Sequence, residues 1–221
     1  KSTVGEITRS EANSLNQKLE EASRNTAYLQ TVTERLFLYN YDPQMSHDKI
    51  KLHRAEDGFF YRDLDTIMDG STIYSSSLPS SLYIASETEL TESLIHRLHV
   101  TEALDLHFQR TVDSNTNIHS VYFSTWDQAN RTYPPIEDIP HLHNAGNQAT
   151  FFKDYELADG KNNPDRKTVW TTTYWNEKAG SWMLSSVAPV YRYGFLEGII
   201  GVNIVLNNFT ANLTSTPLIW H

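Results

Sequence analysis

Side chains able to bind metals or small molecules gather in two stretches of this 221-residue sequence. The first holds His141 and His143 beside Glu137 and Asp138, residue types that ligate zinc and related metals. A solvated loop explains the same residues, and we favour it over a metal site. The chain has no cysteine, no HExxH or GxSxG motif and no phosphate-binding glycine loop. We therefore expect no metal, no cofactor and no enzyme activity, with a hydrolase that uses acid pairs as a lower-ranked alternative.

The second stretch, Val169 to Leu206, is rich in aromatic and β-branched residues and predicts three strands separated by short turns. Side chains alternate between the two faces of a strand. Alternate residues from Ile200 to Leu206 make one face of the third strand apolar, so that face is expected to pack on helices. The opposite face of the sheet is expected to present four residues to a binding site: Trp170, Thr172, Tyr174 and Asn203.

The composition is that of an acidic globular domain. The net charge of −9 disfavours nucleic acid as a partner. Aromatic residues make up 12% of the chain, which fits either a site that encloses small molecules or a sheet core filled with large rings. No apolar run approaches the roughly 20 residues of a membrane span. The abrupt ends of the sequence predict a segment excised from a longer protein.

Residues 1–40 are predicted to form one long helix. Leu15, Ala22, Leu29 and Leu36 recur every seven residues, with a weaker second seam that includes two threonines. The helix either packs on its own domain or also pairs with a second copy of the chain. The threonines make a poor isolated coiled coil, so we leave a homodimer through this helix as an open alternative.

The remaining segments predict a second helix and five strands. Ser86 to Asp113 reads as helical, with Ser86 and Glu89 as a capping box. Residues 40–79 are expected to be irregular with short helical pieces, and residues 136–166 to form a long loop. Two strands are expected between residues 118 and 135, ahead of the three described above. Five antiparallel strands with helices on one face make an α+β domain.

A series of short motifs between Ser86 and Leu206 is specific in its order and spacing. The motifs are VYFSTWDQANRTYPP (Val121–Pro135), Phe151-Phe152, Asn163-Pro164, Trp170-Thr171 with Tyr174, Trp182 to Ser185, Pro189-Val190-Tyr191 and GIIGVNIVL (Gly198–Leu206). Together they resemble the Cache family, whose members are PAS-like extracytoplasmic sensor domains of bacterial receptors.

This resemblance implies a PAS-like five-stranded antiparallel sheet with helices on one face, a long N-terminal helix and a long loop that covers a pocket. It implies a stalk helix at 1–40, a membrane-distal sensor domain at 41–207, and a linker at 208–221 toward a second module or a membrane span. The implied function is small-molecule sensing in the periplasm or outside the cell. The N-terminal helix of a membrane-anchored histidine kinase, diguanylate cyclase or chemoreceptor would pass the signal on. A carbohydrate- or protein-binding module is the alternative.

The resemblance also implies that a ligand lies between the sheet and the long loop. Amine-sensing members carry an Asp where this chain has Asn203, and an Arg-x-Trp-Tyr motif where it has Ala149–Phe152. No carboxylate is evident for a ligand ammonium, so we expect a neutral or anionic ligand. Arg131 would hold a carboxylate with its forked guanidinium, or else form a surface salt bridge. The implied ligand-binding residues are Tyr122, Arg131, Tyr133, Phe152, Trp170, Thr172, Tyr174, Ser185 and Asn203.

Overall fold

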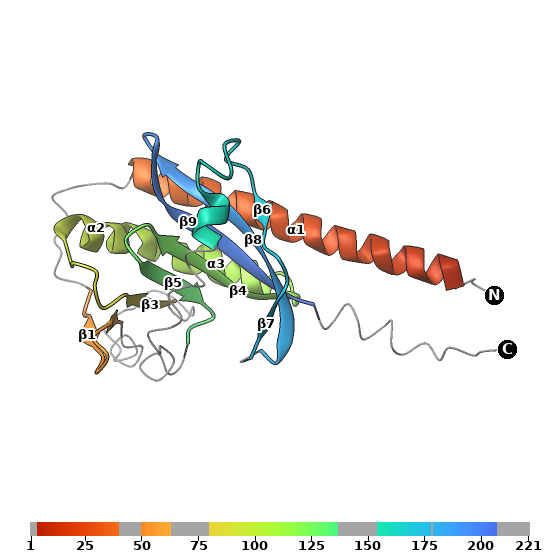
Figure 1. Ribbon diagram of the computed structural model, residues 1–221, viewed down its shortest axis with the longest axis horizontal. Helices are drawn as coiled ribbons and strands as arrows, with labels where there is room; N and C mark the ends of the chain where they lie inside the picture. Colours follow the sequence, from red (N-terminus) through yellow and green to blue (C-terminus); the bar gives the residue numbers. More distant parts are fainter. Residues whose placement is uncertain (1–3, 40–49, 63–79, 137–153, 178, 207–221) are drawn as a thin grey trace.

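The computed structural model describes residues 4–39, 50–62, 80–136, 154–177 and 179–206. In these ranges an antiparallel sheet carries helices on one face (Figure 1). The helices are α1 (Val4–Tyr39), α2 (Glu92–Val100) and α3 (Leu104–Asp113), with the 3₁₀ helix η1 (Thr101–Ala103) between the last two. The predicted α+β class, with its long N-terminal helix, is confirmed.

Among the described residues the sheet has nine strands in the order β1-β2-β3-β5-β4-β9-β8-β6, and β7 also pairs with β8. Their bounds are β1 His53–Arg54, β2 Phe60–Tyr61, β3 Ser81–Ile84, β4 Ile118–Thr125, β5 Ala129–Tyr133, β6 Val169–Trp170, β7 Tyr174–Asn176, β8 Ser181–Arg192 and β9 Phe195–Val205. The predicted count of five was too low. The short strands β1 and β2 lie in the segment expected to be irregular, because two residues leave no alternation to detect.

The two longest strands of the sheet, β8 and β9, form a hairpin. Tyr193 and Gly194 form its turn with φ angles of 50° and 85°, as a two-residue turn with positive φ at both positions requires. This confirms a short turn between the second and third strands predicted in Val169 to Leu206. Pro189 lies inside β8, where β6 no longer pairs with it, so the missing N–H breaks no ladder bond.

Helix α1 packs along the sheet through one continuous stripe. Ala22, Thr26, Leu29, Thr33 and Phe37 are buried at spacings of three and four residues. The two threonine hydroxyls donate to backbone carbonyl oxygens four residues earlier, at 2.9 and 2.7 Å, so no polar group on this stripe is left unpaired. The heptad positions from 22 to 37 therefore serve packing within the domain.

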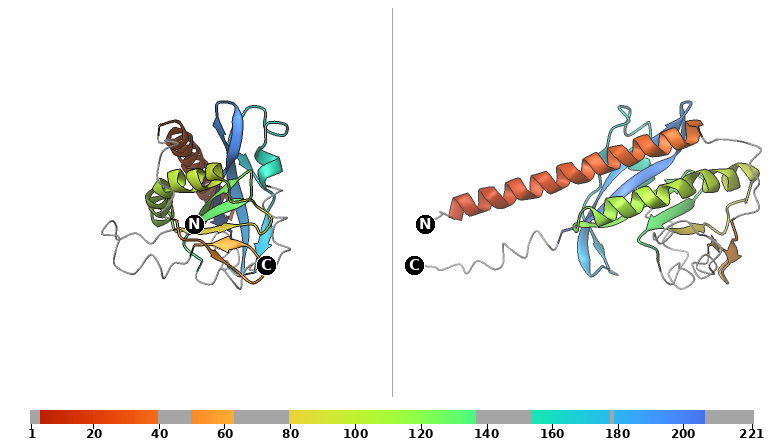
Figure 2. Two further views of the ribbon diagram at one scale, coloured as in Figure 1. Left: turned by 90° about the vertical axis from the view of Figure 1, so that its left-hand side faces the viewer. Right: turned by 180° about the vertical axis from the view of Figure 1, so that it is seen from behind.

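The apolar face of β9 meets this helix. Ile200, Val202 and Ile204 are buried in one cluster with Leu29 of α1 and Phe108 of α3, which confirms the face predicted to pack on helices. The N-terminal turns of α1 continue past the sheet (Figures 1 and 2). Within the described part of the chain, no helix has the length and apolar character needed to cross a membrane.

The second predicted helix starts later than its sequence indicates. Helix α2 begins at Glu92, and its N-cap is Thr91, whose hydroxyl accepts from the Leu94 N–H at 3.1 Å. The capping box at Ser86 and Glu89 was wrong. A tertiary contact holds that segment as a turn, because the Thr88 hydroxyl donates to the Asp127 carbonyl oxygen in the β4–β5 hairpin.

Candidate functional site

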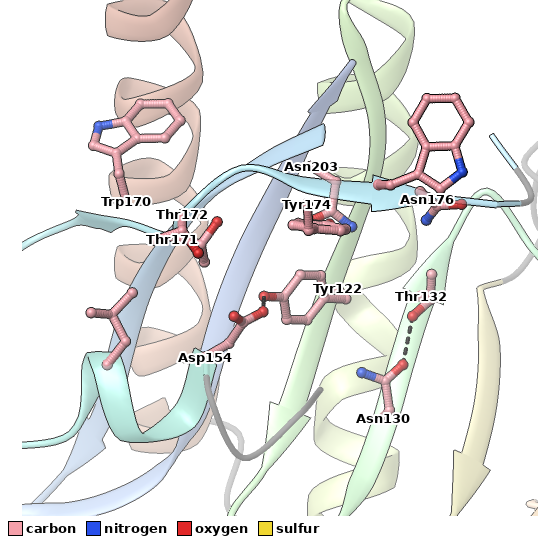
Figure 3. Close-up of a pocket in the computed structure, with 12 residues that line it drawn as sticks. Tyr122, Asn130, Thr132, Asp154, Trp170, Thr171, Thr172, Tyr174, Asn176 and Asn203 are labelled. Carbon is pink, nitrogen blue, oxygen red and sulfur yellow. Dashed lines mark hydrogen bonds between the residues drawn. The ribbon is translucent and has the colours of Figure 1, made fainter. Parts of the chain in front are cut away.

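A cavity of about 650 Å³ lies on the face of the sheet opposite the helices (Figure 3). Strands β4, β5, β7 and β9 contribute its walls, together with a short helical turn at 154–158 and the link between β6 and β7. Its described lining residues are Tyr122, Asn130, Thr132, Asp154, Leu157, Trp170, Thr171, Thr172, Tyr174, Trp175, Asn176 and Asn203. A volume of this size suits a small organic molecule.

Asp154 and Tyr122 join the helical turn to the sheet. The Tyr122 hydroxyl donates to Oδ2 of Asp154 at 2.7 Å (Figure 3). Burial raises the pKa of Asp154, and the Tyr122 hydrogen bond opposes that shift. Burial, reinforced by the Asp154 carboxylate, raises the pKa of Tyr122 well above its usual value, so Tyr122 remains a donor.

Gly201 explains how Tyr122 reaches Asp154. It lies directly opposite Tyr122 in the β4–β9 pair. A Cβ atom at position 201 would lie 2.1 Å from Cζ of Tyr122 and 2.4 Å from its hydroxyl oxygen. The glycine therefore leaves the space in which the ring crosses β9.

Asn203, Ser185 and Tyr174 form a second fixed part of the wall. The Ser185 hydroxyl donates to Oδ1 of Asn203 at 2.7 Å, and Nδ2 of Asn203 donates to the Ser120 hydroxyl at 2.8 Å. The hydroxyl oxygens of Tyr174 and Ser185 lie 3.2 Å apart. Burial raises the pKa of Tyr174, which keeps this hydroxyl protonated. The wall is thus held in one arrangement by hydrogen bonds within the chain.

Strand β5 contributes a further polar pair. The Thr132 hydroxyl donates to Oδ1 of Asn130 at 2.5 Å (Figure 3), and Nδ2 of Asn130 donates to the Ser124 hydroxyl at 2.7 Å. Both side chains face the cavity because they stand two residues apart on one strand.

Five of the predicted site residues line the cavity, Trp170 at its margin and the other four around its interior: Tyr122, Thr172, Tyr174 and Asn203. Ser185 lies behind the wall with no exposed surface and holds Tyr174 and Asn203 in place. Phe152 and the His141–His143 loop lie outside the described residues. Within the described residues, no group of three His, Asp or Glu side chains is close enough to hold a metal ion.

Arg131 and Tyr133 lie on the other face of the sheet. Arg131 is 1% exposed and donates to the Ser80 hydroxyl at 3.0 Å, to Asp105 at 3.2 Å and to the Leu98 carbonyl oxygen at 2.9 Å. Tyr133 belongs to the helix-side core. The structure thus places both predicted residues away from the cavity. Arg131 was expected to bind a ligand or to form a surface salt bridge, but it is a buried cation that holds the fold together.

Trp170 lies at the margin of the cavity, but its ring is directed away from Tyr122 and Asp154 (Figure 3). It pairs with Ser186, whose hydroxyl is hydrogen-bonded to that of Thr26 in α1, and it packs against the helix-side core. The expectation that Trp170 shares a face with Tyr174 was wrong, because residues 171–173 interrupt the strand and reset the alternation.

Asp154 is the functional candidate that the sequence analysis missed, together with Asn130, Thr132 and Asn176. A neutral or anionic ligand was expected because no carboxylate was expected to face the site, but Asp154 lines the cavity. A sequence signal was present in residues 154–158, where apolar positions recur at helical spacing. Tyr155 and Ala158 pack against the sheet and so bring the first residue of the turn, Asp154, over the cavity.

No model of a protein family matches the sequence, and no curated protein matches it. Several solved structures resemble the chain. The ligand-binding domain of the Pseudomonas aeruginosa amino acid chemoreceptor PctC, in complex with GABA, is 21% identical over 51% of this chain and 49% of its own, with a TM-score of 0.36. The ligand-binding domain of the Pseudomonas fluorescens chemoreceptor CtaA, in complex with L-valine, is 15% identical over 52% of this chain and 48% of its own, with a TM-score of 0.39.

The sensory domain of a Campylobacter jejuni chemoreceptor with isoleucine bound is 14% identical over 91% of this chain and 66% of its own, with a TM-score of 0.40. The chain therefore spans about half the length of the first two domains. All three are ligand-binding or sensory domains of chemoreceptors.

Proposed function

We propose that this chain is the small-molecule-binding module of an extracytoplasmic bacterial sensor, and that its ligand occupies the cavity above β4 and β9. The observation that carries this proposal is the cavity itself. It measures about 650 Å³, and tyrosine, threonine and asparagine side chains line it. Such a recess, already formed on the sheet and lined by polar and aromatic side chains, is suited to binding a small molecule.

Strand β8 provides a route from the cavity to α1. Ser185 contacts Asn203 and Tyr174 on the cavity side, and its N–H donates to the hydroxyl of Thr171 at 3.0 Å. The next residue, Ser186, points to the helix side, and its hydroxyl oxygen lies 2.8 Å from the hydroxyl oxygen of Thr26, so the two hydroxyls are hydrogen-bonded. Gln30 of α1 also donates to the Pro189 carbonyl oxygen at 2.6 Å.

A shift of β8 on ligand binding would therefore move the surface on which α1 rests. In the full-length receptor, α1 would carry that change across the membrane to a histidine kinase, diguanylate cyclase or chemotaxis output. The ligand needs only to bind one of two arrangements of β8 and α1 more tightly than the other.

The carbohydrate-binding alternative would use exposed tryptophans. Trp175 and Trp182 are each 50% exposed, but their rings meet edge to face at 73°. A sugar ring stacks on a flat aromatic surface, which this pair does not offer. The geometry therefore favours the cavity over an open aromatic platform.

The test is a thermal-shift screen of the chain against a metabolite library, repeated on two matched variants. Thr172→Trp places a large ring in the cavity, and Thr173→Trp places the same ring at an exposed neighbour outside the described lining. We expect the screen to find ligands that raise the Tm of the wild type and of Thr173→Trp but leave the Tm of Thr172→Trp unchanged. Hits that stabilise all three proteins equally would show that the ligand binds elsewhere and would refute the cavity as the sensory site.

A further inference from the structure

The charge of the cavity lining restricts what it can bind. Among its described lining residues, Asp154 alone carries a formal charge at neutral pH, and no Lys, Arg or His is present. The hydroxyls of Tyr122 and Tyr174 stay neutral, because burial raises the pKa of both. The described part of the lining therefore presents one negative charge and uncharged polar groups.

Within the described part of the chain, the only hydrogen bond that Asp154 makes is the one from Tyr122 to Oδ2. A partly buried carboxylate supported by one neutral donor is incompletely compensated. A cation beside its other oxygen would complete the site. The rings of Tyr122 and Tyr174 line the same cavity, and aromatic faces attract cations.

The same cavity is unsuited to a ligand carboxylate. Arg131, the cation that the motifs suggested for this role, is buried on the opposite face and bound to Asp105. Asn130 and Asn203 each use one amide N–H on Ser124 and Ser120, which leaves one uncharged N–H apiece for a ligand. A second carboxylate would meet the like charge of Asp154 with no described cation to offset it.

We propose that the cavity selects a ligand with a protonated amine and no carboxylate, and that Asp154 binds the amine. This inference rests on the proposed function and narrows its ligand class. The counter-charge belongs to the helical turn at 154–158, so an amine that also contacts the sheet would link the turn to β4 more firmly than Tyr122 does alone.

The test uses four probes built on one carbon skeleton: butylamine, butyramide, butyrate and 4-aminobutyrate. Binding to the chain is measured by ligand-observed NMR at millimolar probe concentrations. Asp154→Asn removes the charge and keeps an acceptor for Tyr122. Asp165→Asn is the matched control, because it removes one carboxylate from an exposed position paired with Lys167, outside the described lining.

We expect butylamine to bind the wild type and Asp165→Asn, and to bind Asp154→Asn at least about tenfold more weakly, as the loss of a charged hydrogen bond implies. Butyrate and 4-aminobutyrate should bind more weakly than butylamine. Acidifying the wild type gives the same test without a variant, because protonation of Asp154 should release butylamine, and it replaces the variant should Asp154→Asn fail to fold.

Three results would overturn the inference. They are equal binding of butyrate and butylamine, butylamine binding that Asp154→Asn leaves unchanged, and failure of butylamine to bind the wild type. If the metabolite screen still yields a ligand that Thr172→Trp excludes, the proposed function survives and only the ligand class is wrong. If neither the probes nor the screen gives a ligand sensitive to Thr172→Trp, both proposals fail.

Discussion

Gly201→Ala offers the sharpest test of how the cavity is built. The added Cβ would lie 2.1 Å from Cζ of Tyr122, whereas ordinary contact starts at 3.4 Å, so the ring must move by about 1.3 Å. The Tyr122 hydroxyl then moves away from Asp154, to which it is bonded at 2.7 Å. The three atoms nearest to the new Cβ all belong to the Tyr122 side chain, so the clash is specific to one partner.

The expected cost follows from two terms. Overpacking costs about 1–3 kcal/mol, and losing a hydrogen bond to a charged group costs about 1.5–3 kcal/mol. Because the ring relaxes toward the cavity, the terms overlap, and we expect a loss of about 3 kcal/mol in the free energy of unfolding. Urea denaturation followed by tryptophan fluorescence measures this change.

A double-mutant cycle isolates the cause. Tyr122→Leu keeps an apolar side chain in the core but removes the ring atoms that meet the new Cβ. In that background Gly201→Ala should change the free energy of unfolding by no more than about 0.5 kcal/mol. An equal loss in both backgrounds would show that Gly201 is needed for its backbone and not for the passage of the Tyr122 ring.

Three further predictions follow from single contacts. Thr91→Ala removes the N-cap of α2 and should lower the free energy of unfolding by about 1 kcal/mol, whereas Ser86→Ala should lower it by less than about 0.5 kcal/mol. Urea titration measures both losses. A larger loss for Ser86→Ala than for Thr91→Ala would show that Ser86 caps the helix after all. Arg131→Met should cost about 3 kcal/mol in the same assay, because Ser80 and the Leu98 carbonyl lose their donor, and a neutral outcome would refute a structural role. Burial raises the folded-state pKa of Asp154, so its stabilising contribution is present in acid and is lost as pH rises through that pKa. Without ligand, Asp154→Asn should therefore have a higher Tm than the wild type at neutral pH and lose this advantage in acid. A difference in Tm that does not depend on pH would contradict the raised pKa of Asp154.

Alternation along uninterrupted strands could be predicted from the sequence. The apolar residues of β9 pack on α1 and Asn203 faces the cavity, because an eleven-residue strand leaves one consistent pattern. The same rule, applied to β5, places Asn130 and Thr132 in the cavity and Arg131 and Tyr133 behind the sheet. The motif resemblance pointed instead to Arg131 and Tyr133, one residue out of phase with the cavity face.

Other features depend on contacts that no local pattern records. Trp170 and Tyr174 would share a face in one continuous strand, but the strand breaks at 171–173 and its two parts pair separately with β8. Asp154 reaches the cavity because Tyr155 and Ala158 pack on the sheet, and this packing depends on residues distant in sequence. The cap at Thr91 was missed for a similar reason, since the β4–β5 hairpin holds the earlier candidate in a turn.

The two sides of β8 make the cavity and α1 mechanically dependent on each other. Consecutive residues in a strand point to opposite faces, so Ser185 and Ser186 cannot move separately. Ser185 is hydrogen-bonded to the cavity wall and Ser186 to Thr26, and neither serine has exposed surface. A change of wall geometry that displaces Ser185 must therefore break the Thr26 contact or carry α1 with it.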